Sequence, residues 1–173
     1  MSVDDSFDAQ FRQAFDARYR ALFRYLDRLA GDPALAADIA QETFVKLYQR
    51  GAMPDNAGAW LVSVANNHFR DERRRAGRRL RLLARRTPDA TLADPPPAPD
   101  AGLFSDSERR AVRTALDSMH ERERQLLLLR LEGYSYRELA SALGLPETSV
   151  GTLLLRARGA FRVAMARATH ASD

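Results

Sequence analysis

Prolines cluster in one short segment of this 173-residue chain, and the cluster divides the rest into two parts. Five of the eight prolines lie in the run TPDATLADPPPAPDAG, residues 87–102. Proline fixes φ and has no backbone N–H, so such a run favours an extended conformation over a helix or a paired strand. The segment predicts an extended linker over 81–104, between a unit at 5–80 and a unit at 105–168.

Both flanking parts show the hydrophobic periodicity of helices, and neither contains a convincing strand. Apolar residues recur every three or four positions from Phe7 to Leu29, and Gly31-Asp32-Pro33 ends this pattern. The sequence then predicts a helix over 34–50, a loop over 51–59 and a third helix that begins near Trp60. Further helices are predicted over 107–119 and 121–133, followed by a helix, a short turn and another helix over 134–165. The predicted fold class is therefore all-α, with two small helical domains.

Composition argues against several functional classes. The absence of cysteine argues against disulfides and thiol chemistry and fits a reducing cytosol, so we expect a cytoplasmic protein. His68, His120 and His170 do not have the spacing of metal ligands. No apolar run of membrane-spanning length and no export signal occurs, so we expect no membrane insertion. Because there is also no Gly-rich phosphate loop and no paired nucleophile and base, we expect neither an enzyme nor a cofactor.

The segment from Tyr134 to Met165 has the pattern of a helix-turn-helix. Ser135 and Glu138 form an S-x-x-E capping box at the start of its first helix. Gly144 permits a sharp turn, and Pro146 suits the first turn of the next helix. An ordinary helical hairpin remains the alternative to a DNA-binding motif.

Positions on the second helix of this motif separate a core face from a reading face. At 100° per residue, Val150 and the residues near its direction point inward: Leu153, Leu154, Ala157 and Phe161. The outward face carries Ser149, Thr152, Leu155 and Arg156, and Arg158 flanks it. Such residues can meet bases or phosphates in a major groove.

The helix from Trp60 continues into a strongly basic run. Nine arginines lie between Arg70 and Arg86, against only Asp71 and Glu72. Such a density attracts phosphate. A solvated helix end is the alternative, and a GC-rich genome could account for the preference for arginine over lysine. One stripe of this helix carries Trp60, Asn67, Asp71, Arg74 and Arg78.

The helix over 34–50 has two distinct faces. Asp38, Gln41, Glu42 and Val45 share one side, and apolar residues share the other. Periodicity alone leaves open whether the polar side is solvated or contacts a partner.

Three segments resemble the bacterial extracytoplasmic-function (ECF) sigma factors. DIAQETFVKLY resembles the family's D-L-V-Q-E-T-F-L-R-A-W, and AWLVSVANNHFRDERRR resembles W-L-Y-R-I-A-R-N-x-x-x-D-x-x-R-R. The segment LDSMHERERQLLLLRLEGYSYRELASALGLPETSVGTLLLRAR is similar to the family's C-terminal motif. The resemblance covers residues 10–165 in order, with a linker where the family has one. Asn66, Gly151 and Leu153 depart from it, because the family usually has basic residues there.

The resemblance implies an alternative sigma factor that binds core RNA polymerase and directs transcription initiation at promoters. It implies that the second domain contacts the polymerase flap and that the linker threads toward the active-site channel, with Asp89, Asp94 and Asp100 mimicking nucleic acid. The loop from Gly51 to Ala59 would hold a flipped-out base of the melted −10 strand. The residues implied to contact the clamp helices of the largest subunit are Asp38, Gln41, Glu42 and Val45. Those implied at the −10 strand are Asn67, Arg70, Asp71 and Arg74, and those at the −35 element are Ser149, Thr152, Leu155, Arg156 and Arg158.

The chain ends soon after the second unit, so we expect no sensor domain and consider control by an anti-sigma protein.

Two other functions remain open at this point. A stand-alone helix-turn-helix regulator would bind duplex operator DNA without polymerase. A helical adaptor would bind a protein partner and never contact DNA, and the arginine cluster beside Asn67 argues against it.

Overall fold

The computed structural model describes residues 3–84 and 105–170, and every regular element in these two ranges is an α-helix. We call α1–α3 the N-terminal unit and α4–α7 the C-terminal unit. The N-terminal unit comprises α1 (Val3–Ala30), α2 (Pro33–Arg50) and α3 (Ala57–Ala84). The C-terminal unit comprises α4 (Asp106–Ser118), α5 (Glu121–Leu131), α6 (Tyr136–Leu143) and α7 (Glu147–His170). The predicted all-α fold is confirmed.

Helix α3 differs from its prediction at both ends. It begins at Ala57 rather than near Trp60, because Asn56 Oδ1 accepts a hydrogen bond from the Ala59 N–H at 3.0 Å and caps an earlier first turn. It also continues to Ala84, past the predicted start of the linker at residue 81. The rest of the predicted linker, with Asp89, Asp94 and Asp100, lies outside the described residues.

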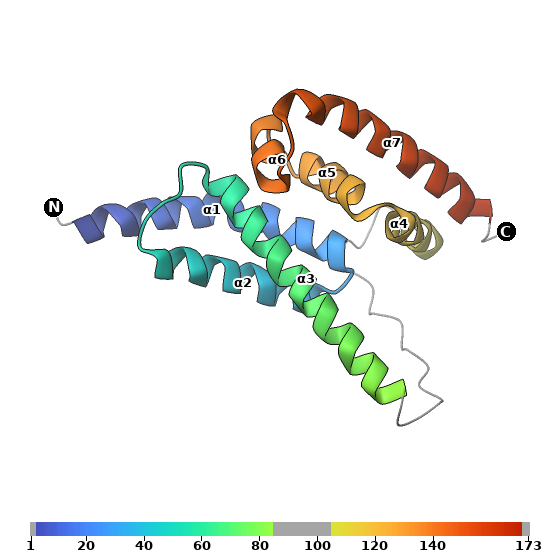
Figure 1. The fold of residues 1–173 in the computed structure, drawn as a ribbon, viewed down its shortest axis with the longest axis horizontal. Helices are drawn as coiled ribbons and strands as arrows, with labels where there is room; N and C mark the ends of the chain where they lie inside the picture. The colour runs from blue at the N-terminus through green and yellow to red at the C-terminus, as the bar shows by residue number, and fades with distance from the viewer. Residues whose placement is uncertain (1–2, 85–104, 171–173) are drawn as a thin grey trace.

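The turn between α1 and α2 uses the Gly-Asp-Pro sequence as expected. Gly31 has a φ of 68°, a backbone conformation that favours glycine. The Asp32 side chain accepts from the Leu35 N–H at 3.1 Å, and Pro33 occupies the first turn of α2. The two helices consequently pack side by side in the N-terminal unit (Figure 1).

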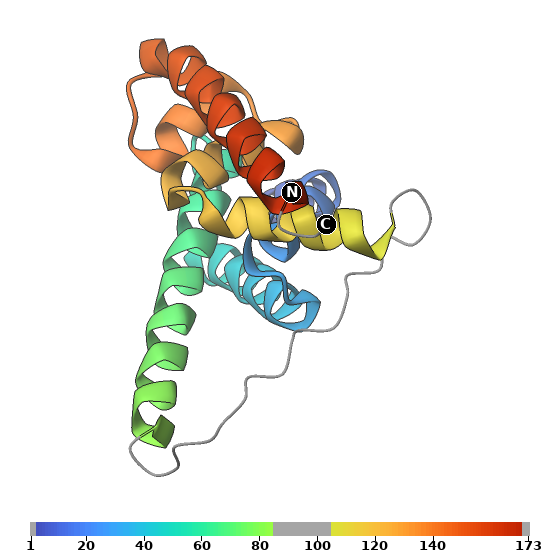
Figure 2. The same ribbon diagram turned by 90° about the vertical axis from the view of Figure 1, so that its right-hand side faces the viewer.

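Helix α3 crosses the other two helices of its unit and then projects beyond them (Figures 1 and 2). Its first half is anchored in the core by Leu61, Val62, Ala65 and Phe69, which are at most 3% exposed. From residue 70 to residue 82 no side chain of α3 is buried. The apolar half of α3 therefore packs in the core, and the basic half extends into solvent.

The C-terminal unit contains the predicted helix-turn-helix. Ser135 Oγ accepts from the Glu138 N–H at 3.2 Å, and Glu138 Oε2 accepts from the Ser135 N–H at 2.8 Å, which completes the capping box. Gly144 ends α6 with a φ of 63°. Helix α7 then packs on α4, α5 and α6.

The two units also pack against each other, which the sequence did not predict. Helix α5 contacts α1, and α6 contacts α3. Buried apolar residues of both units belong to one hydrophobic cluster. The C-terminal unit therefore lies over the start of α3, and the far half of α3 extends away from it (Figure 1).

Tyr25 and Tyr134 are two buried tyrosines, of which only the first is hydrogen-bonded. The Tyr25 O–H donates to Asn66 Oδ1 at 2.7 Å, whereas the Tyr134 hydroxyl has no hydrogen-bond partner among the described residues. Burial raises the pKa of both hydroxyls, that of Tyr134 to about 12. Both groups are therefore neutral at pH 7.

Tyr25→Phe is expected to lower the free energy of unfolding by about 1–3 kcal/mol, because Asn66 Oδ1 is left buried and unpaired. Tyr134→Phe removes a buried hydroxyl that forms no hydrogen bond, so its free energy of unfolding should be unchanged or slightly raised. Urea denaturation followed by circular dichroism measures both. Equal losses in the two variants would contradict this expectation.

Candidate nucleic-acid interface

The exposed face of α3 carries the four residues predicted to contact the −10 strand. Asn67, Arg70, Asp71 and Arg74 are all exposed. Arg70 Nη1 donates to Asn67 Oδ1 at 3.4 Å, and Arg74 Nη1 lies 3.6 Å from Asp71 Oδ1. Because each pair is three residues apart on one helix, the structure brings all four into a single strip. Burial lowers the pKa of the neighbouring His68, which adds no charge to the strip at pH 7.

The strip borders a groove lined mostly by arginine side chains. Arg73, Arg81 and Glu121 were not among the predicted site residues, although the three- and four-residue spacing after Arg70 would have placed both arginines on this face. A groove of this charge suits a polyanion. The lining residues are Arg70, Arg73, Arg74, Gly77, Arg78, Arg81 and Glu121.

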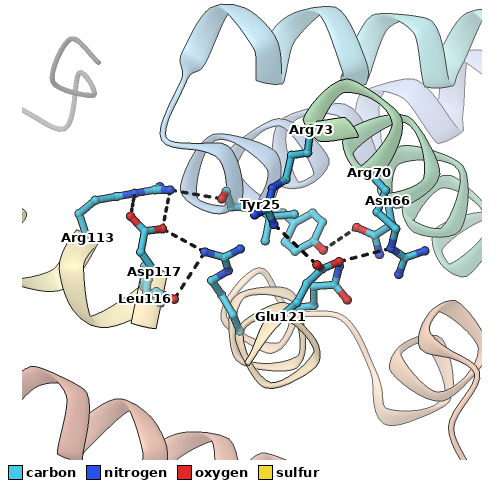
Figure 3. Close-up of polar contacts among 11 residues, drawn as sticks. Tyr25, Asn66, Arg70, Arg73, Arg113, Leu116, Asp117 and Glu121 are labelled. Atoms are coloured by element: carbon cyan, nitrogen blue, oxygen red, sulfur yellow. Dashed lines mark hydrogen bonds and ion pairs between the residues drawn. The ribbon is translucent and has the colours of Figure 1, made fainter. Parts of the chain in front are cut away.

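Glu121, the first residue of α5, places a carboxylate against the arginines of this groove. One of its oxygens lies 3.3 Å from Arg70 Nε, and the other lies 3.7 Å from Arg73 Nη1 (Figure 3). The three side chains are 39–56% exposed, and ion pairs of that exposure contribute about 0–1 kcal/mol each. The ion pairs of Glu121 with Arg70 and Arg73 are therefore weak. The capping and periodicity rules that predicted the helices are local, so they carry no signal for a pair 51 residues apart.

The two faces of α2 are arranged as predicted. Asp38, Gln41, Glu42 and Val45 are all exposed, and Val45 retains 46% of its accessible surface. These four residues form what we call the α2 face. The opposite side is buried in the core and carries Ile39, Ala40, Thr43, Phe44 and Leu47.

A group of aromatic side chains lies between α1 and α2 and was not predicted as a site. Phe15 and Tyr48 remain 37% and 55% exposed. Phe11 and Tyr48 have ring centroids 5.3 Å apart, and those of Phe15 and Phe44 are 5.0 Å apart. Aromatic side chains are enriched in protein interfaces, so this group adds apolar area to the same unit as the α2 face.

The predicted reading face of α7 is open. Thr152, Leu155, Arg156 and Arg158 are exposed, and Ser149 is half-buried. Neither Arg156 nor Arg158 forms an ion pair with a residue that the structure describes, so both guanidinium groups are available to a ligand.

The core face of α7 agrees with the angular prediction at most positions. Val150, Leu154 and Ala157 are at most 3% exposed. Leu153 and Phe161 point inward as predicted and pack against the core cluster, but at its edge, where they are only partly buried. Leu153 lies 60° from Val150 on the helix, which places it at the margin of the packed stripe.

The described residues, 3–84 and 105–170, offer neither a metal-binding cluster nor a membrane-spanning helix. No group of three or more His, Cys, Asp or Glu side chains in these ranges could hold a metal ion. None of the described helices is long and apolar enough to cross a membrane.

Comparisons with known proteins match both units. The family model described as "Sigma-70 region 2" matches residues 14–79, and the one described as "Sigma-70, region 4" matches residues 109–161. The ECF RNA polymerase sigma factor SigL of Mycobacterium tuberculosis (strain H37Rv) is 32% identical over 162 residues, which are 91% of this chain and 89% of SigL. The chain belongs to the ECF sigma factor family.

Two further comparisons define the extent of the likeness. The ECF RNA polymerase sigma factor SigE of Mycolicibacterium smegmatis is 31% identical over 97% of this chain, and the matched part spans 64% of SigE. The structure of the sigma factor RpoE in complex with the anti-sigma factor NepR from Bartonella quintana matches with a TM-score of 0.67. That match covers 90% of this chain and 96% of the other at 22% identity, so it supports the shared fold alone.

This ECF sigma factor has an internal hydrogen bond at one position where it departs from the family pattern. Asn66 is 2% exposed, and its side-chain oxygen accepts the Tyr25 hydroxyl hydrogen bond at the centre of the N-terminal unit (Figure 3). A buried arginine there would need a counter-charge. Asn66 therefore stabilises the fold, and the adjacent Asn67 supplies the exposed amide.

Proposed function

We propose that this chain directs core RNA polymerase to promoters by recognising a −10 and a −35 element. Two exposed surfaces on separate helices support this proposal. One is the strip of α3 with the arginine groove beside it, and the other is the reading face of α7. The first suits a melted single strand, whose phosphates and splayed bases arginine and asparagine can bind. The second belongs to a helix-turn-helix, whose second helix enters a major groove.

The proposed domain assignment follows the two units. Residues 5–80, together with the last turn of α3 to Ala84, would bind polymerase and the −10 element, the rest of residues 81–104 would link the units, and residues 105–168 would bind the −35 element. The loop before α3 would receive a flipped-out base, in the manner of other proteins that read single strands. We assign no chemical step to the chain, which would act by binding alone.

The proposed protein partner is core RNA polymerase. The α2 face would dock on the clamp helices of the largest subunit, and the C-terminal unit would contact the flap. An anti-sigma protein is a further proposed partner, by analogy with the sigma factor of the same fold that forms a complex with an anti-sigma factor. Since polymerase and promoter DNA are cytoplasmic in bacteria, we expect the chain to act there.

Run-off transcription tests the proposal. Purified chain is mixed with core polymerase and fragments of genomic promoters, and the transcripts are compared with those from core polymerase alone. A promoter-specific transcript that requires the chain is expected. Absence of any such transcript would refute the proposal, and tight binding to duplex DNA without polymerase would favour a stand-alone regulator instead.

Arg156→Ala is expected to lose more promoter activity than Leu155→Ala. Arginine can make a bidentate base contact worth about 1–3 kcal/mol, which corresponds to roughly 5- to 150-fold in binding. Leucine can offer only apolar contact with a thymine methyl group. Both side chains are exposed, so neither change should affect folding, and the run-off assay measures the order. The reverse order would mean that the outward face is misassigned.

A further inference from the structure

A glycine lies in the part of α3 that has no support from the core. From residue 70 to residue 82 no side chain of α3 is buried, and the helix projects beyond the rest of its unit there (Figure 2). A glycine inside a helix destabilises it relative to alanine, and no buried side chain of this segment offsets that loss. Gly77 is therefore unfavourable for the helix of the free chain.

Most of the described glycines have a visible reason within the fold. A Cβ atom at Gly58 would lie 2.4 Å from Glu138 Oε1. Only Gly77 and Gly159 have neither a positive φ nor another described atom within 4 Å of the place of a Cβ. The fold of the free chain therefore does not require glycine at these two positions. Four others have a positive φ, which side chains rarely adopt: Gly31, Gly51, Gly133 and Gly144.

Both of these unexplained glycines lie on surfaces that we propose to bind DNA. Gly159 follows Val150 by nine residues on α7, so it points to the side opposite the core, where the reading face lies. Gly77 lines the arginine groove of α3. Glycine is favoured where a ligand approaches the backbone closely, because it has no side chain that would hold the ligand away. The two positions therefore indicate an external ligand.

Three arginines surround Gly77 on the surface of the helix. Side chains three or four residues apart are neighbours on a helix, which places Arg73 and Arg74 on one side of Gly77 and Arg81 on the other. All three arginines line the same groove. The missing side chain thus leaves space among three guanidinium groups, and a phosphate in that space can accept hydrogen bonds from more than one of them.

The positive charge of this groove is poorly neutralised within the described chain. Five arginines line it against one carboxylate, that of Glu121, whose ion pairs are half-exposed. Arg78 and Arg81 form no ion pair with a residue that the structure describes. Arg74 and Arg78 are four residues apart, and like charges at that spacing destabilise a helix. An anionic ligand would remove this repulsion at the same place where glycine weakens the helix.

We propose that the far half of α3 binds the phosphodiester backbone of DNA, with a phosphate seated on the helix at Gly77 among Arg73, Arg74 and Arg81. That the ligand is DNA rests on the proposed function. Residues 75–82 are Arg, Ala, Gly or Leu, so this segment has no amide or aromatic side chain for a base. The contact is therefore independent of base sequence, and it positions the chain for the strip around Asn67.

Gly77→Ala separates this proposal from a role in folding, because the two predict effects of opposite sign. Alanine stabilises the helix, so helix stability alone predicts equal or tighter DNA binding. A phosphate seated at Gly77 predicts weaker binding, because the Cβ atom takes its place. The probes are fluorescent random-sequence DNAs, one duplex and one single-stranded, and anisotropy gives their Kd for the full-length chain. Loss of one phosphate contact should raise the Kd about three- to tenfold.

The double variant Ala76→Gly with Gly77→Ala is the matched control for helix stability. It keeps composition and net charge and moves the glycine by 100°, away from the groove, which Ala76 does not line. Its helix should be as stable as that of wild type, and its Kd should rise as in Gly77→Ala. Hydrogen exchange of residues 70–82, followed by mass spectrometry, measures the helix. Exchange should slow in Gly77→Ala, and DNA should slow it in wild type.

Arg81→Gln tests the charge of the site. The slope of log affinity against log salt concentration reports how many phosphates are neutralised, and it should fall by about 1 in this variant. Arg79→Gln removes the same charge from an exposed position that does not line the groove. Its slope should stay near that of wild type.

A rise in Kd in both Gly77→Ala and the double variant supports the proposal. The probe that shows the rise identifies whether duplex DNA or a melted strand supplies the phosphate. Unchanged or tighter binding of both probes by Gly77→Ala would overturn the proposal, as would a loss that is absent from the double variant. Failure of wild type to bind either probe at low salt would also overturn it.

Equal falls of the salt slope in Arg79→Gln and Arg81→Gln would indicate diffuse attraction in place of a site, and would likewise overturn the proposal. These measurements use neither polymerase nor a promoter. Failure of the run-off assay in wild type would therefore count against the proposed function and leave these results unaffected.

Discussion

Glu42→Arg is expected to abolish promoter-specific transcription while leaving the fold intact. Glu42 is exposed at the middle of the α2 face, and no hydrogen bond or ion pair joins its side chain to another residue that the structure describes. A carboxylate buried in an interface is received by a cation or another hydrogen-bond donor, and arginine presents donors only. Juxtaposed like groups cost several kcal/mol, which corresponds to a loss of about a hundredfold or more in polymerase affinity.

Asp16→Arg is the matched control for this change. Asp16 is exposed on α1 in the same unit, and the substitution alters net charge by the same amount. Affinity for core polymerase, measured by fluorescence anisotropy, should fall in Glu42→Arg and stay near wild type in Asp16→Arg. Equal affinities in the two variants would remove Glu42, and with it the α2 face, from the proposed polymerase contact.

Leu139→Ala is expected to lower the free energy of unfolding by about 2–5 kcal/mol, a large share of the stability of a small protein. Leu139 is 0% exposed in α6, a helix of eight residues that is too short to persist in isolation. Only Ala140 and Leu143 accompany it on the buried face. The cavity should therefore loosen the whole helix-turn-helix and displace the reading face of α7.

Arg137→Ala tests whether this loss comes from the core. Arg137 is exposed on the same helix, and alanine keeps the helix propensity high. Urea denaturation should give a change within about 0.5 kcal/mol for Arg137→Ala. A similar loss in both variants would show that the effect of Leu139→Ala does not come from the buried face of α6.

The sequence predicted those features that depend on neighbours within a few residues. The two faces of α2 follow from helical spacing, and the capping box of Ser135 and Glu138 follows from a four-residue motif. Gly31-Asp32-Pro33 predicted the turn after α1 for the same reason. The exposed strip at Asn67 and Arg70 could be predicted equally well, because periodicity decides which residues of a half-buried helix face solvent.

Features that join distant parts of the chain could not be predicted in this way. Glu138 illustrates the limit, because its two carboxylate oxygens have different roles. Oε2 completes the local capping box, while Oε1 pairs with Arg18 in the other unit. Glu132 joins Arg24 and Arg28 across more than one hundred residues of sequence. Such pairs depend on how whole helices dock, and no motif encodes them.

The half-exposed pairing of Glu121 with α3 bears on how readily the arginine groove meets bulk DNA. A genome offers about a million or more non-specific sites to any protein with a free arginine surface. Glu121 pairs with Arg70 and Arg73 only through half-exposed contacts, so it competes weakly with such sites, while the α2 face remains uncovered. The arginine groove of α3 therefore stays open to titration by non-specific DNA.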